Sequence, residues 1–386
     1  MKDRFDGTHM NPKSQNSRSD DTPPRPVVTA RFPEGAGRSP QMSARSAQEP
    51  ARPRQEQARS TQGPRPPKRK KHGGLIIVLI LVVGVLSAGY LLFRHFYGLM
   101  NYQPITESAA SSDDVSTAAN DDVYNILLLG NDSRDADTSG RTDTMILVSI
   151  NKETKKIVLT SFMRDMYLYI PGYDGYQRLN AANVYGGVSM TEATIEQNFD
   201  IHIDRYVEVD FYAFIDAVNS LGGVDVTLTD ADINEMNLKM QEVNWYMYQD
   251  DSRLYDDNIS GGAGDYHLDG AQTLAYCRMR YVDDDFGRTQ RQRDVLGQLW
   301  DEARSSSPIK TYGLMKNVLP QVTSDLTSGE CLKLLFSLIQ MKNYELVSQR
   351  VPASGTYSDE VIDDMDVLSV DLPANITILQ NAIYGN

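Results

Sequence analysis

The sequence is poor in the residues on which disulfide scaffolds, zinc sites and histidine-based catalysis depend. Its 386 residues include two cysteines, Cys277 and Cys331, and five histidines. Two cysteines cannot form a disulfide scaffold, and the chain has neither a Cys-x-x-Cys pair nor a His-rich stretch that would indicate zinc. Cys277 is expected to be a small buried hydrophobic residue, and a bond to Cys331 stays open. Since no glycine-rich stretch is followed by Lys and then Ser or Thr, the sequence also excludes a P-loop.

Positive charge is scarce in most of the chain. Residues 72–386 hold 22 basic and 45 acidic side chains, a net charge of −23, whereas residues 1–71 hold 16 basic and 7 acidic side chains, a net charge of +9. So uneven a distribution excludes one uniform globule. It also argues against a main domain that binds nucleic acid, because such a domain would be basic as a whole.

The beginning of the chain predicts a disordered tail and a membrane anchor. Residues 1–71 are rich in Pro, Arg, Ser, Gln and Gly and contain two aromatic residues, so they cannot bury enough apolar surface to offset the entropy lost on folding. Residues 75–93 form a run of 19 residues without a charge, which nearly spans a hydrocarbon layer about 30 Å thick. The alternatives are a buried core helix and a cleaved signal peptide, and the leader and the run are both too long for the second.

Four basic residues at 68–71 precede this run, whereas only Arg94 and His95 follow it directly. The positive-inside rule therefore places the tail in the cytoplasm and the rest of the chain outside. We predict a single-pass protein of the cell membrane with four parts. These are a disordered basic cytoplasmic tail at 1–74, a transmembrane signal-anchor helix at 75–95, a flexible extracellular stalk at 96–121 and a large extracellular domain at 122–386.

Three short apolar runs at the start of the outer domain predict strands, at 125–130, 144–150 and 156–162. If they form an antiparallel meander, the end of the first, the start of the second and the end of the third lie at one edge of the sheet. The charged residues at these points are Asp132, Arg141, Asp143, Arg164 and Asp165. Ligands commonly bind where strands end in open α/β sheets, so this edge is a candidate site.

The following segments alternate between strand and helix patterns. We expect a strand at 205–209, a helix at 211–220 and a strand at 224–228, which is typical of an α/β domain. Residues 229–265 are treated as an insertion or lid of unknown shape. The alternation at 273–281 predicts an extended segment with Arg278 and Arg280 on one face. Helices are expected from about Thr289 and at 329–341.

The distribution of arginine predicts a site for phosphate. Five of the 14 arginines after residue 72 lie within sixteen residues, and no lysine lies between Lys239 and Lys310. Clustered guanidinium groups suit a polyphosphate, because each donates two parallel hydrogen bonds and keeps its charge when desolvated. The alternative is a network with the neighbouring carboxylates at 283–285 and 294. Asp132 and Asp143 favour a metal–phosphate site, since Mg²⁺ takes one or two carboxylates together with phosphate oxygens.

Seven segments in order resemble the LytR–CpsA–Psr family. They are LLLGND at 127–132, GRTDTM at 140–145, SFMRD at 161–165, LNAANVYGG at 179–187, LGGVDV at 221–226, LDGAQTLAYCRMR at 268–280 and DFGRTQRQRDV at 285–295. The resemblance covers roughly residues 125–300. Met163 stands where the family usually has Pro, and Arg178 where it often has Lys, and neither departure removes a charge.

The resemblance implies a phosphotransferase with a three-layer α/β/α sandwich around a central mixed sheet and an apolar groove for a polyprenyl chain. Such proteins move an anionic glycopolymer, a teichoic acid or capsule-like polysaccharide, from undecaprenyl pyrophosphate to the 6-hydroxyl of N-acetylmuramic acid in peptidoglycan. By the same resemblance, Asp132 and Asp143 would hold Mg²⁺, or Mn²⁺ in its place. The groups implied to clamp the pyrophosphate are Arg141, Arg164, Arg278, Arg280, Arg288, Arg291 and Gln292. Arg141 and Arg164 would also act in catalysis, and Asp143 is preferred to Asp165 as the proton acceptor.

Other functions stay open at this point. A protein that binds polyprenyl pyrophosphate without catalysis would need the arginines but not the carboxylates. A pyrophosphatase would use water in place of the sugar hydroxyl. A transcriptional regulator is disfavoured, because the anionic domain is expected on the far side of the membrane. The expected partners are therefore the lipid-linked glycopolymer, peptidoglycan and the membrane, and no nucleic acid.

Overall fold

The computed structural model describes residues 73–105, 120–131, 142–173, 175–280 and 284–385, except for the side chains of 73–80, 284, 338 and 339. All of these residues belong to the unit Lys71–Asn386. Most of the predicted cytoplasmic tail, and both Asp132 and Arg141, lie outside the described residues.

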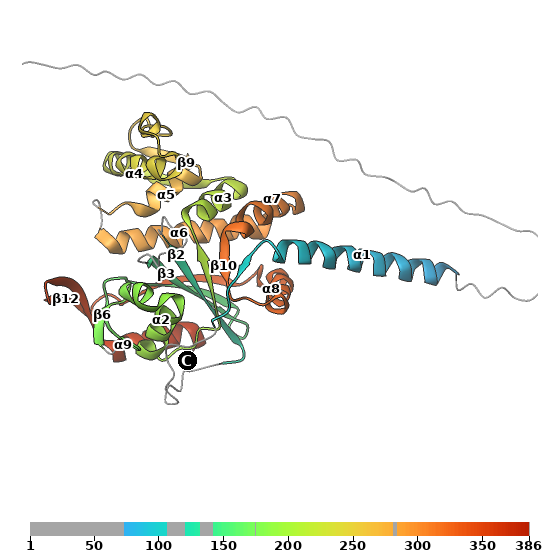
Figure 1. Cartoon of the computed structure of the whole chain (residues 1–386), viewed down its shortest axis with the longest axis horizontal. Coiled ribbons are helices and arrows are strands. Elements are labelled where there is room, and N and C mark those ends of the chain that lie inside the picture. Colours follow the sequence, from blue (N-terminus) through green and yellow to red (C-terminus); the bar gives the residue numbers. More distant parts are fainter. Residues whose placement is uncertain (1–72, 106–119, 132–141, 174, 281–283, 386) are drawn as a thin grey trace, which may run out of the picture. The chain divides into compact units, whose positions relative to one another are not determined.

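A seven-stranded mixed sheet forms the centre of this unit, in the order β1-β10-β7-β2-β3-β4-β11 (Figure 1). The strands are β1 (Asn101–Tyr102), β2 (Val123–Asn131), β3 (Thr142–Asn151), β4 (Lys156–Phe162), β7 (Arg205–Val209), β10 (Val322–Ser324) and β11 (Glu345–Val351). Three neighbouring pairs are parallel, β1 with β10, β2 with β7 and β4 with β11, and the others are antiparallel. The prediction of a mixed α/β fold with a central mixed sheet is confirmed.

The predicted meander is present in β2, β3 and β4. Gly130 near the end of β2 pairs with Thr144 near the start of β3, and Ile146 pairs with Ser161 near the end of β4. The three strands therefore bring their ends to one edge, as their sequence order requires for antiparallel neighbours. This edge carries the candidate site.

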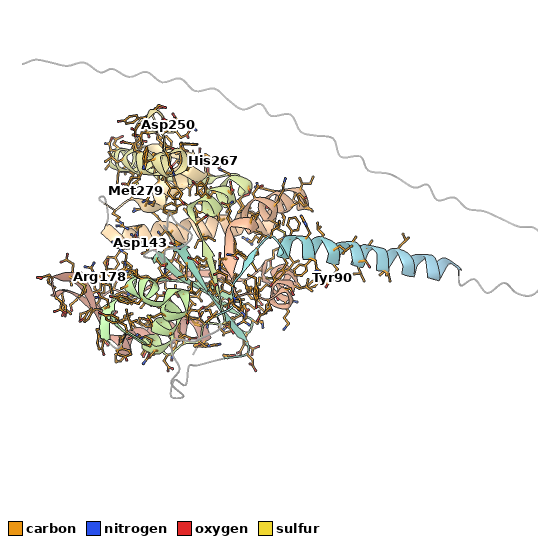
Figure 2. All side chains as sticks on the ribbon, viewed as in Figure 1. Tyr90, Asp143, Arg178, Asp250, His267 and Met279 are labelled. Atoms are coloured by element: carbon orange, nitrogen blue, oxygen red, sulfur yellow. The ribbon has the colours of Figure 1, made fainter. Side chains whose placement is uncertain are left out.

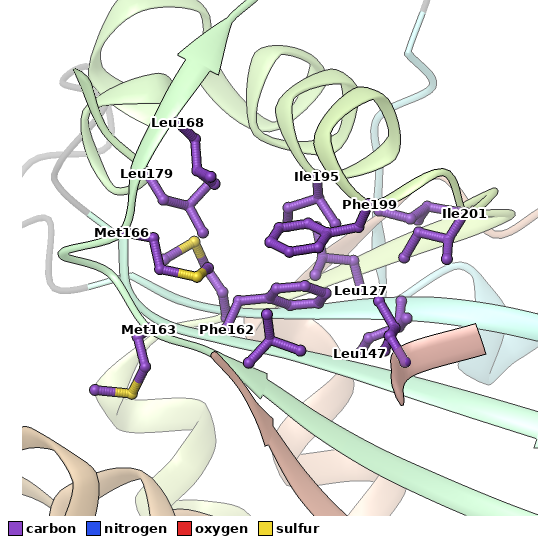
Figure 3. Packing of buried hydrophobic residues seen from close by; sticks show 14 of the residues in the cluster. Leu127, Leu147, Phe162, Met163, Met166, Leu168, Leu179, Ile195, Phe199 and Ile201 are labelled. Atoms are coloured by element: carbon purple, nitrogen blue, oxygen red, sulfur yellow. The ribbon is translucent and has the colours of Figure 1, made fainter. Parts of the chain in front are cut away.

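Helices cover both faces of the sheet, which explains why its central strands are apolar on both sides. On one face, α2 (Ala181–Phe199) and α9 (Leu372–Tyr384) pack against Leu127, Leu147 and Phe162. Figure 3 shows Phe162 and Phe199 of this core facing each other, with ring centroids 5.2 Å apart. On the other face, α6 (Asp284–Ser305) and α8 (Ser328–Met341) cover Ile146, Ile157 and their neighbours.

A group of helices and one small sheet lies beyond the site edge. It comprises α3 (Phe211–Leu221), β8 (Val224–Leu228), α4 (Asp230–Tyr248), η1 (Asp251–Arg253), β9 (Gly264–Leu268), α5 (Gly270–Arg278), α7 (Pro308–Val318) and η2 (Leu319–Gln321). Helix α4 gives the segment 229–265 its shape, and its buried Met236 and Met240 share a core with Leu268 and Leu274. Gly270 permits α5 to approach α3, because a Cβ atom there would lie 2.3 Å from the Ile215 carbonyl oxygen.

Two hairpins flank the opposite side of the site edge. They are β5 (Tyr167–Ile170) with β6 (Gly175–Arg178), and β12 (Tyr357–Ile362) with β13 (Met365–Val370). The second hairpin is tied to the segment that follows β4, because the Leu368 N–H donates to the Asp165 carbonyl at 2.9 Å. It therefore stands beside the end of β4.

Two sequence-based expectations were wrong in detail. Residues 273–281 were expected to be extended, but 270–278 form α5, because Asp269 and Gln272 make a reciprocal capping box that starts a helix. Helix α6 begins at Asp284, five residues before the expected start. Most of the predicted stalk at 96–121, residues 106–119, lies outside the described residues, and near its start β1 pairs with β10.

The predicted anchor at 75–95 falls within α1 (Gly73–Tyr97), whose apolar side chains from Leu81 to Leu92 include many that are exposed. Within the described part of the chain, none of the helices meets the combined length and apolarity that a membrane crossing requires. The anchor stays a prediction.

Candidate active site

Asp143 at the start of β3 meets two arginines from distant parts of the chain. Its Oδ1 accepts a hydrogen bond from Arg164 Nη1 at 2.9 Å, and its Oδ2 lies 3.0 Å from Arg280 Nη2. Arg164 follows the end of β4, and Arg280 follows α5. Figure 2 shows Asp143 near the sheet edge, below Met279 and close to α6. The expected convergence of strand-end charges is confirmed for Asp143 and Arg164.

Asp285, in the first turn of α6, is a second centre of the same network. Its Oδ2 lies 3.1 Å from Arg164 Nε and 2.8 Å from Arg288 Nη2, and its Oδ1 lies 3.5 Å from Arg280 Nε. Arg164 also lies 3.4 Å from Asp165, so three guanidinium groups face three carboxylates. The network expected as an alternative to a phosphate site is therefore present.

Arg288 is the most buried cation of the network, with 2% of its surface exposed. Besides its bond to Asp285, its Nη2 donates to the main-chain oxygen of Asp143 at 3.3 Å. Its Nε and Nη1 atoms have no hydrogen-bond partner among the residues that the structure describes. A buried donor without an acceptor is costly, and a charged one more so, unless a ligand completes its bonds. The geometry suits an anion with several oxygens.

The network fixes the charges of its members at neutral pH. Burial would raise the pKa of Asp143, but Arg164, Arg288 and Arg280 together outweigh this effect and lower it. Burial lowers the pKa of Arg288 to about 10, although Asp285 acts in the opposite direction. Asp143 is therefore ionised and Arg288 still carries its positive charge at pH 7.

A cavity of about 210 Å³, here called the arginine cavity, opens beside this network. Its lining residues are Gly130, Asp143, Thr144, Phe211, Lys239, Glu242, Cys277, Arg278, Arg280, Arg288 and Gln292. A second cavity of about 130 Å³, here called the apolar cavity, shares six of them, Gly130, Thr144, Phe211, Cys277, Arg278 and Gln292. It continues between the sheet and α3, α5 and α6, where Leu128, Ile146 and Leu296 contribute to its wall. A site for an anionic group thus adjoins one for an apolar chain.

The remaining predicted residues divide into those at the arginine cavity and those elsewhere. Arg278 lies 3.3 Å from Glu242 and over the ring of Phe211, with 5.0 Å to its centroid. Gln292 donates to the Thr144 hydroxyl at 3.1 Å. Arg291 does not line the cavity, because its guanidinium donates to the carbonyls of Tyr276 and Met279 at the end of α5.

Asp165 lies on the other side of Arg164, 3.4 Å from its Nε, and faces the side of hairpin β12–β13. Four functional candidates were missed by sequence reasoning. Asp285 was considered only as a counter-ion, and Thr144, Lys239 and Glu242 were not considered. The spacing of Lys239 and Glu242, three residues apart on α4, indicates an ion pair but does not show that α4 borders the site.

The donor set is compatible with one metal ligand. Among the residues that the structure describes, no three His, Cys, Asp or Glu side chains are grouped so as to hold a metal ion. Asp143 is ionised, and each of its oxygens uses one of two lone pairs for an arginine. Mg²⁺ needs only one or two carboxylates when phosphate oxygens and waters complete its shell, so Asp143 fits this role.

Comparison with known proteins gives consistent matches. A model described as the LytR_cpsA_psr family matches residues 97–380. The polyisoprenyl-teichoic acid–peptidoglycan teichoic acid transferase TagU of Bacillus licheniformis is 32% identical over 272 residues, which are 68% of this chain and 81% of TagU. The solved structure of TagT bound to LI-WTA has a TM-score of 0.56 and 27% identity, over 72% of this chain and 99% of that one. The structure of YwtF (TagT) with bound octaprenyl pyrophosphate lipid has a TM-score of 0.52 and 26% identity, over the same shares.

Proposed function

The chain belongs to the LytR–CpsA–Psr family, and on that premise we propose that it transfers an anionic glycopolymer from a polyprenyl-pyrophosphate carrier to peptidoglycan. The observation that carries this proposal is the buried guanidinium of Arg288, which has unpartnered N–H groups and lines a cavity that continues into an apolar one. A lipid-borne diphosphate has both parts that such a pair of cavities requires.

The donor would bind with its diphosphate in the arginine cavity and the first part of its polyprenyl chain in the apolar cavity. Arg278, Arg280 and Arg288, which line this cavity, would supply charge-assisted hydrogen bonds to the phosphate oxygens. Each CH₂ group that leaves water contributes roughly 0.8 kcal/mol to binding. The two cavities therefore select a donor that joins a diphosphate to a lipid.

In the reaction, the 6-hydroxyl of N-acetylmuramic acid would attack the phosphorus atom that bears the glycopolymer. The new phosphodiester bond forms while the bond to the second phosphate breaks, and polyprenyl phosphate leaves. Phosphoryl transfer depends mainly on alignment and on stabilising charge at the oxygens, which the three arginines supply. The hydroxyl proton passes to a carboxylate.

We assign that proton to Asp165 rather than to Asp143, which was preferred from the sequence. Both oxygens of Asp143 already accept bonds from arginines, and its lowered pKa makes it a weak base. Asp165 borders Arg164 from the opposite side. Transfer by Asp165→Asn should fall about 100-fold or more, because the variant has no carboxylate there to accept the proton, and a rate near that of the wild type would exclude this role.

Asp143 suits a Mg²⁺ ligand, with Asp132 as the expected second one. A bound Mg²⁺ would neutralise charge on the diphosphate oxygens. Chelation of the metal should then slow transfer, and added Mg²⁺ should restore it in the wild type but not in Asp143→Asn. A rate that does not respond to chelation would remove the metal from the proposal.

The main test compares two buried arginines of α6 in the full-length protein. Arg288→Met removes a positive charge from the arginine cavity. Arg293→Met removes a positive charge elsewhere, because Arg293, which is 4% exposed, donates to Ser348 outside that cavity. The rate of polymer attachment to peptidoglycan should fall about 100-fold or more in Arg288→Met, which is the effect of losing one hydrogen-bond donor to the transition state. In Arg293→Met the rate should stay near that of the wild type.

The products separate the competing functions. Retained transfer in Arg288→Met would refute the assignment. Release of polymer phosphate without attachment, even when peptidoglycan is present, would identify a pyrophosphatase. Donor that is bound but never cleaved would identify a binding protein.

A further inference from the structure

A larger cavity of about 590 Å³ adjoins the active-site network on the side of hairpin β12–β13. We call it the hairpin cavity, and its lining residues are Met163, Asp165, Asp285, Phe286, Tyr357, Asp359, Glu360, Val361, Asp366, Val367 and Leu368. None of these residues lines the arginine cavity or the apolar cavity. The donor as placed above does not use this space.

We propose that the hairpin cavity binds the acceptor, the N-acetylhexosamine backbone of a glycan strand whose muramic carboxyl groups are held as peptide amides, and presents its primary hydroxyl to the active site. The inference rests on the proposed function and names the acceptor subsite, which that function leaves open. Four features of the described residues support it.

The hairpin cavity and the reactive centre share a wall. Asp165 and Asp285 line the cavity and also contact Arg164, at 3.4 Å and 3.1 Å from its Nε. Asp285 in addition binds Arg288 at 2.8 Å. A hydroxyl that reaches Asp165 from the cavity therefore lies beside Arg164, which also contacts Asp143 of the arginine cavity.

The lining has the chemistry of a sugar site. Phe286 and Tyr357 lie with ring centroids 5.2 Å apart and an interplanar angle of 36°. Arg350 lies over the ring of Phe286, 4.1 Å from its centroid, and holds it in place. Rings of this kind provide an apolar surface for the C–H face of a pyranose. Carboxylates beside them accept hydrogen bonds from sugar hydroxyls and from the acetamido N–H.

The charges of the two polar cavities differ in sign. Among the described residues, five of the eleven that line the hairpin cavity are acidic and none is basic, and three of the five, Asp359, Glu360 and Asp366, lie outside the arginine network. The arginine cavity has four basic and two acidic lining residues. An anionic glycopolymer is therefore repelled from the hairpin cavity and attracted to the arginine cavity. An uncharged glycan can enter the acidic side, so the charges keep donor and acceptor apart.

The hairpin is held in register with the end of β4. Besides the bond from Leu368 to Asp165, Met166 and Leu368 form a β-bridge, and the Arg178 guanidinium donates to the Asp366 carbonyl. These contacts fix the far wall of the cavity relative to Arg164. A glycan bound between the hairpin and Phe286 would thus have a defined position at the active site.

The experiment measures acceptor binding and transfer separately in the full-length protein. The first variant, Asp359→Asn with Glu360→Gln, removes two charges from the cavity and preserves side-chain size. The matched control, Asp363→Asn with Asp364→Asn, removes two charges from the turn of the same hairpin, outside the lining. Both turn residues have positive φ, which Asn tolerates, so the control should fold. Tyr357→Ala removes one ring, with its folding checked by thermal melting.

Binding of soluble chito-oligosaccharides, used as uncharged fragments of an N-acetylhexosamine chain, is followed by saturation-transfer NMR and calorimetry, and transfer to peptidoglycan by polymer attachment. We expect the affinity for the fragments and the KM for the acceptor to weaken about tenfold or more in the cavity variants, with the KM for the donor unchanged, and neither to change in the control. Equal fragment affinity in the wild type and the charge variant would overturn the inference, whatever the transfer rate. Fragment binding that depends on the cavity, in a protein without transfer activity, would support the subsite and refute the proposed function.

Discussion

The pKa values of Asp143 and Glu192 are shifted in opposite directions because their charged neighbours differ. Asp143 lies among arginines, and its pKa is lowered. Glu192 on α2 is half-buried, and burial of its carboxyl group, together with the charges of Asp325 and Glu196, raises its pKa to about 9, while Arg205 acts in the opposite direction. Within the described part of the chain, its Oε1 atom has no hydrogen-bond partner. Glu192 is therefore protonated in the folded protein at neutral pH, and burial of its carboxyl group lowers the stability of the fold.

This difference predicts the effect of Glu192→Gln on stability. Between pH 4.5, the usual pKa, and about 9, folded Glu192 keeps a proton that the unfolded chain has lost, so stability falls as pH rises through this range. Glutamine has no such proton to hold. We expect Glu192→Gln to raise Tm by a few degrees at pH 8, where 1 kcal/mol corresponds to about 2–4 °C, and to change it little at pH 5. Calorimetric melting at both pH values checks this, and an equal change at both would contradict it.

At the same scale, the sequence predicted which residues gather at the candidate site better than how they are oriented. Asp143 and Arg164 could be found because antiparallel strands bring their ends together. Arg288 and Arg291 are three residues apart on α6, so helical spacing groups them together. Only the position of α5 shows that Arg291 binds its carbonyls while Arg288 lines the arginine cavity. That choice depends on packing between distant segments, which spacing does not encode.

Among the elements, α8 shows how a helix is fixed on the sheet at its first turn. Thr327 caps the helix, and Thr327 and Glu330 form a reciprocal capping box. Glu330 also accepts a hydrogen bond from Arg205 Nε of β7 at 2.9 Å. Burial would raise the pKa of Glu330, but Arg205 and Thr327 outweigh it and lower the pKa to about 2. The stability that ionised Glu330 contributes through these bonds is fully present above about pH 4.5 and is lost as the pH falls toward 2.

Thr327→Ala is therefore expected to loosen α8 without affecting the reaction. Loss of the cap should cost about 1 kcal/mol of unfolding free energy, because one backbone donor of the first turn loses its acceptor. Thr327 lines none of the three cavities described above, so transfer at 25 °C should match the wild type. Urea unfolding and a transfer assay test both parts, with Thr327→Ser as the variant that restores the cap. An unfolding free energy equal to that of the wild type would show that the cap contributes nothing.

Element prediction succeeded where apolar periodicity was clear and failed where a cap overrode it. The strands β2, β3, β4 and β7 and the helix α3 lie close to their expected positions, because their apolar patterns are continuous. Residues 273–280 alternate like a strand, yet the capping box of Asp269 and Gln272 begins a helix before the alternation starts. The Asp-x-x-Gln pattern was the signal that could have shown this. Nothing in the polar segment 229–265 indicated that α4 borders the active site.

For the whole molecule, the proposed anchor determines where the reaction takes place. The sequence predicts a membrane helix at 75–95 ahead of a domain that would use a lipid-linked donor. At the end of α1, Phe96 is 3% exposed and packs on Tyr312 with ring centroids 5.1 Å apart. The Tyr97 hydroxyl donates to the Leu326 carbonyl at 3.2 Å. These contacts belong to the domain, so a chain that starts at Arg94 would keep them.

We therefore predict that removal of residues 1–93 separates membrane binding from catalysis. The full-length protein should sediment with lipid vesicles and the shortened one should stay in the supernatant, because it has lost the apolar run. With a long-chain donor in vesicles, transfer by the shortened protein should fall about tenfold or more, since tethering raises the effective concentration of enzyme at the lipid surface. With a water-soluble short-chain donor, both proteins should have the same kcat/KM and nearly the same Tm. A full-length protein that does not bind vesicles would refute the anchor, and an equal loss with both donors would show instead that the removed segment supports the fold of the active site.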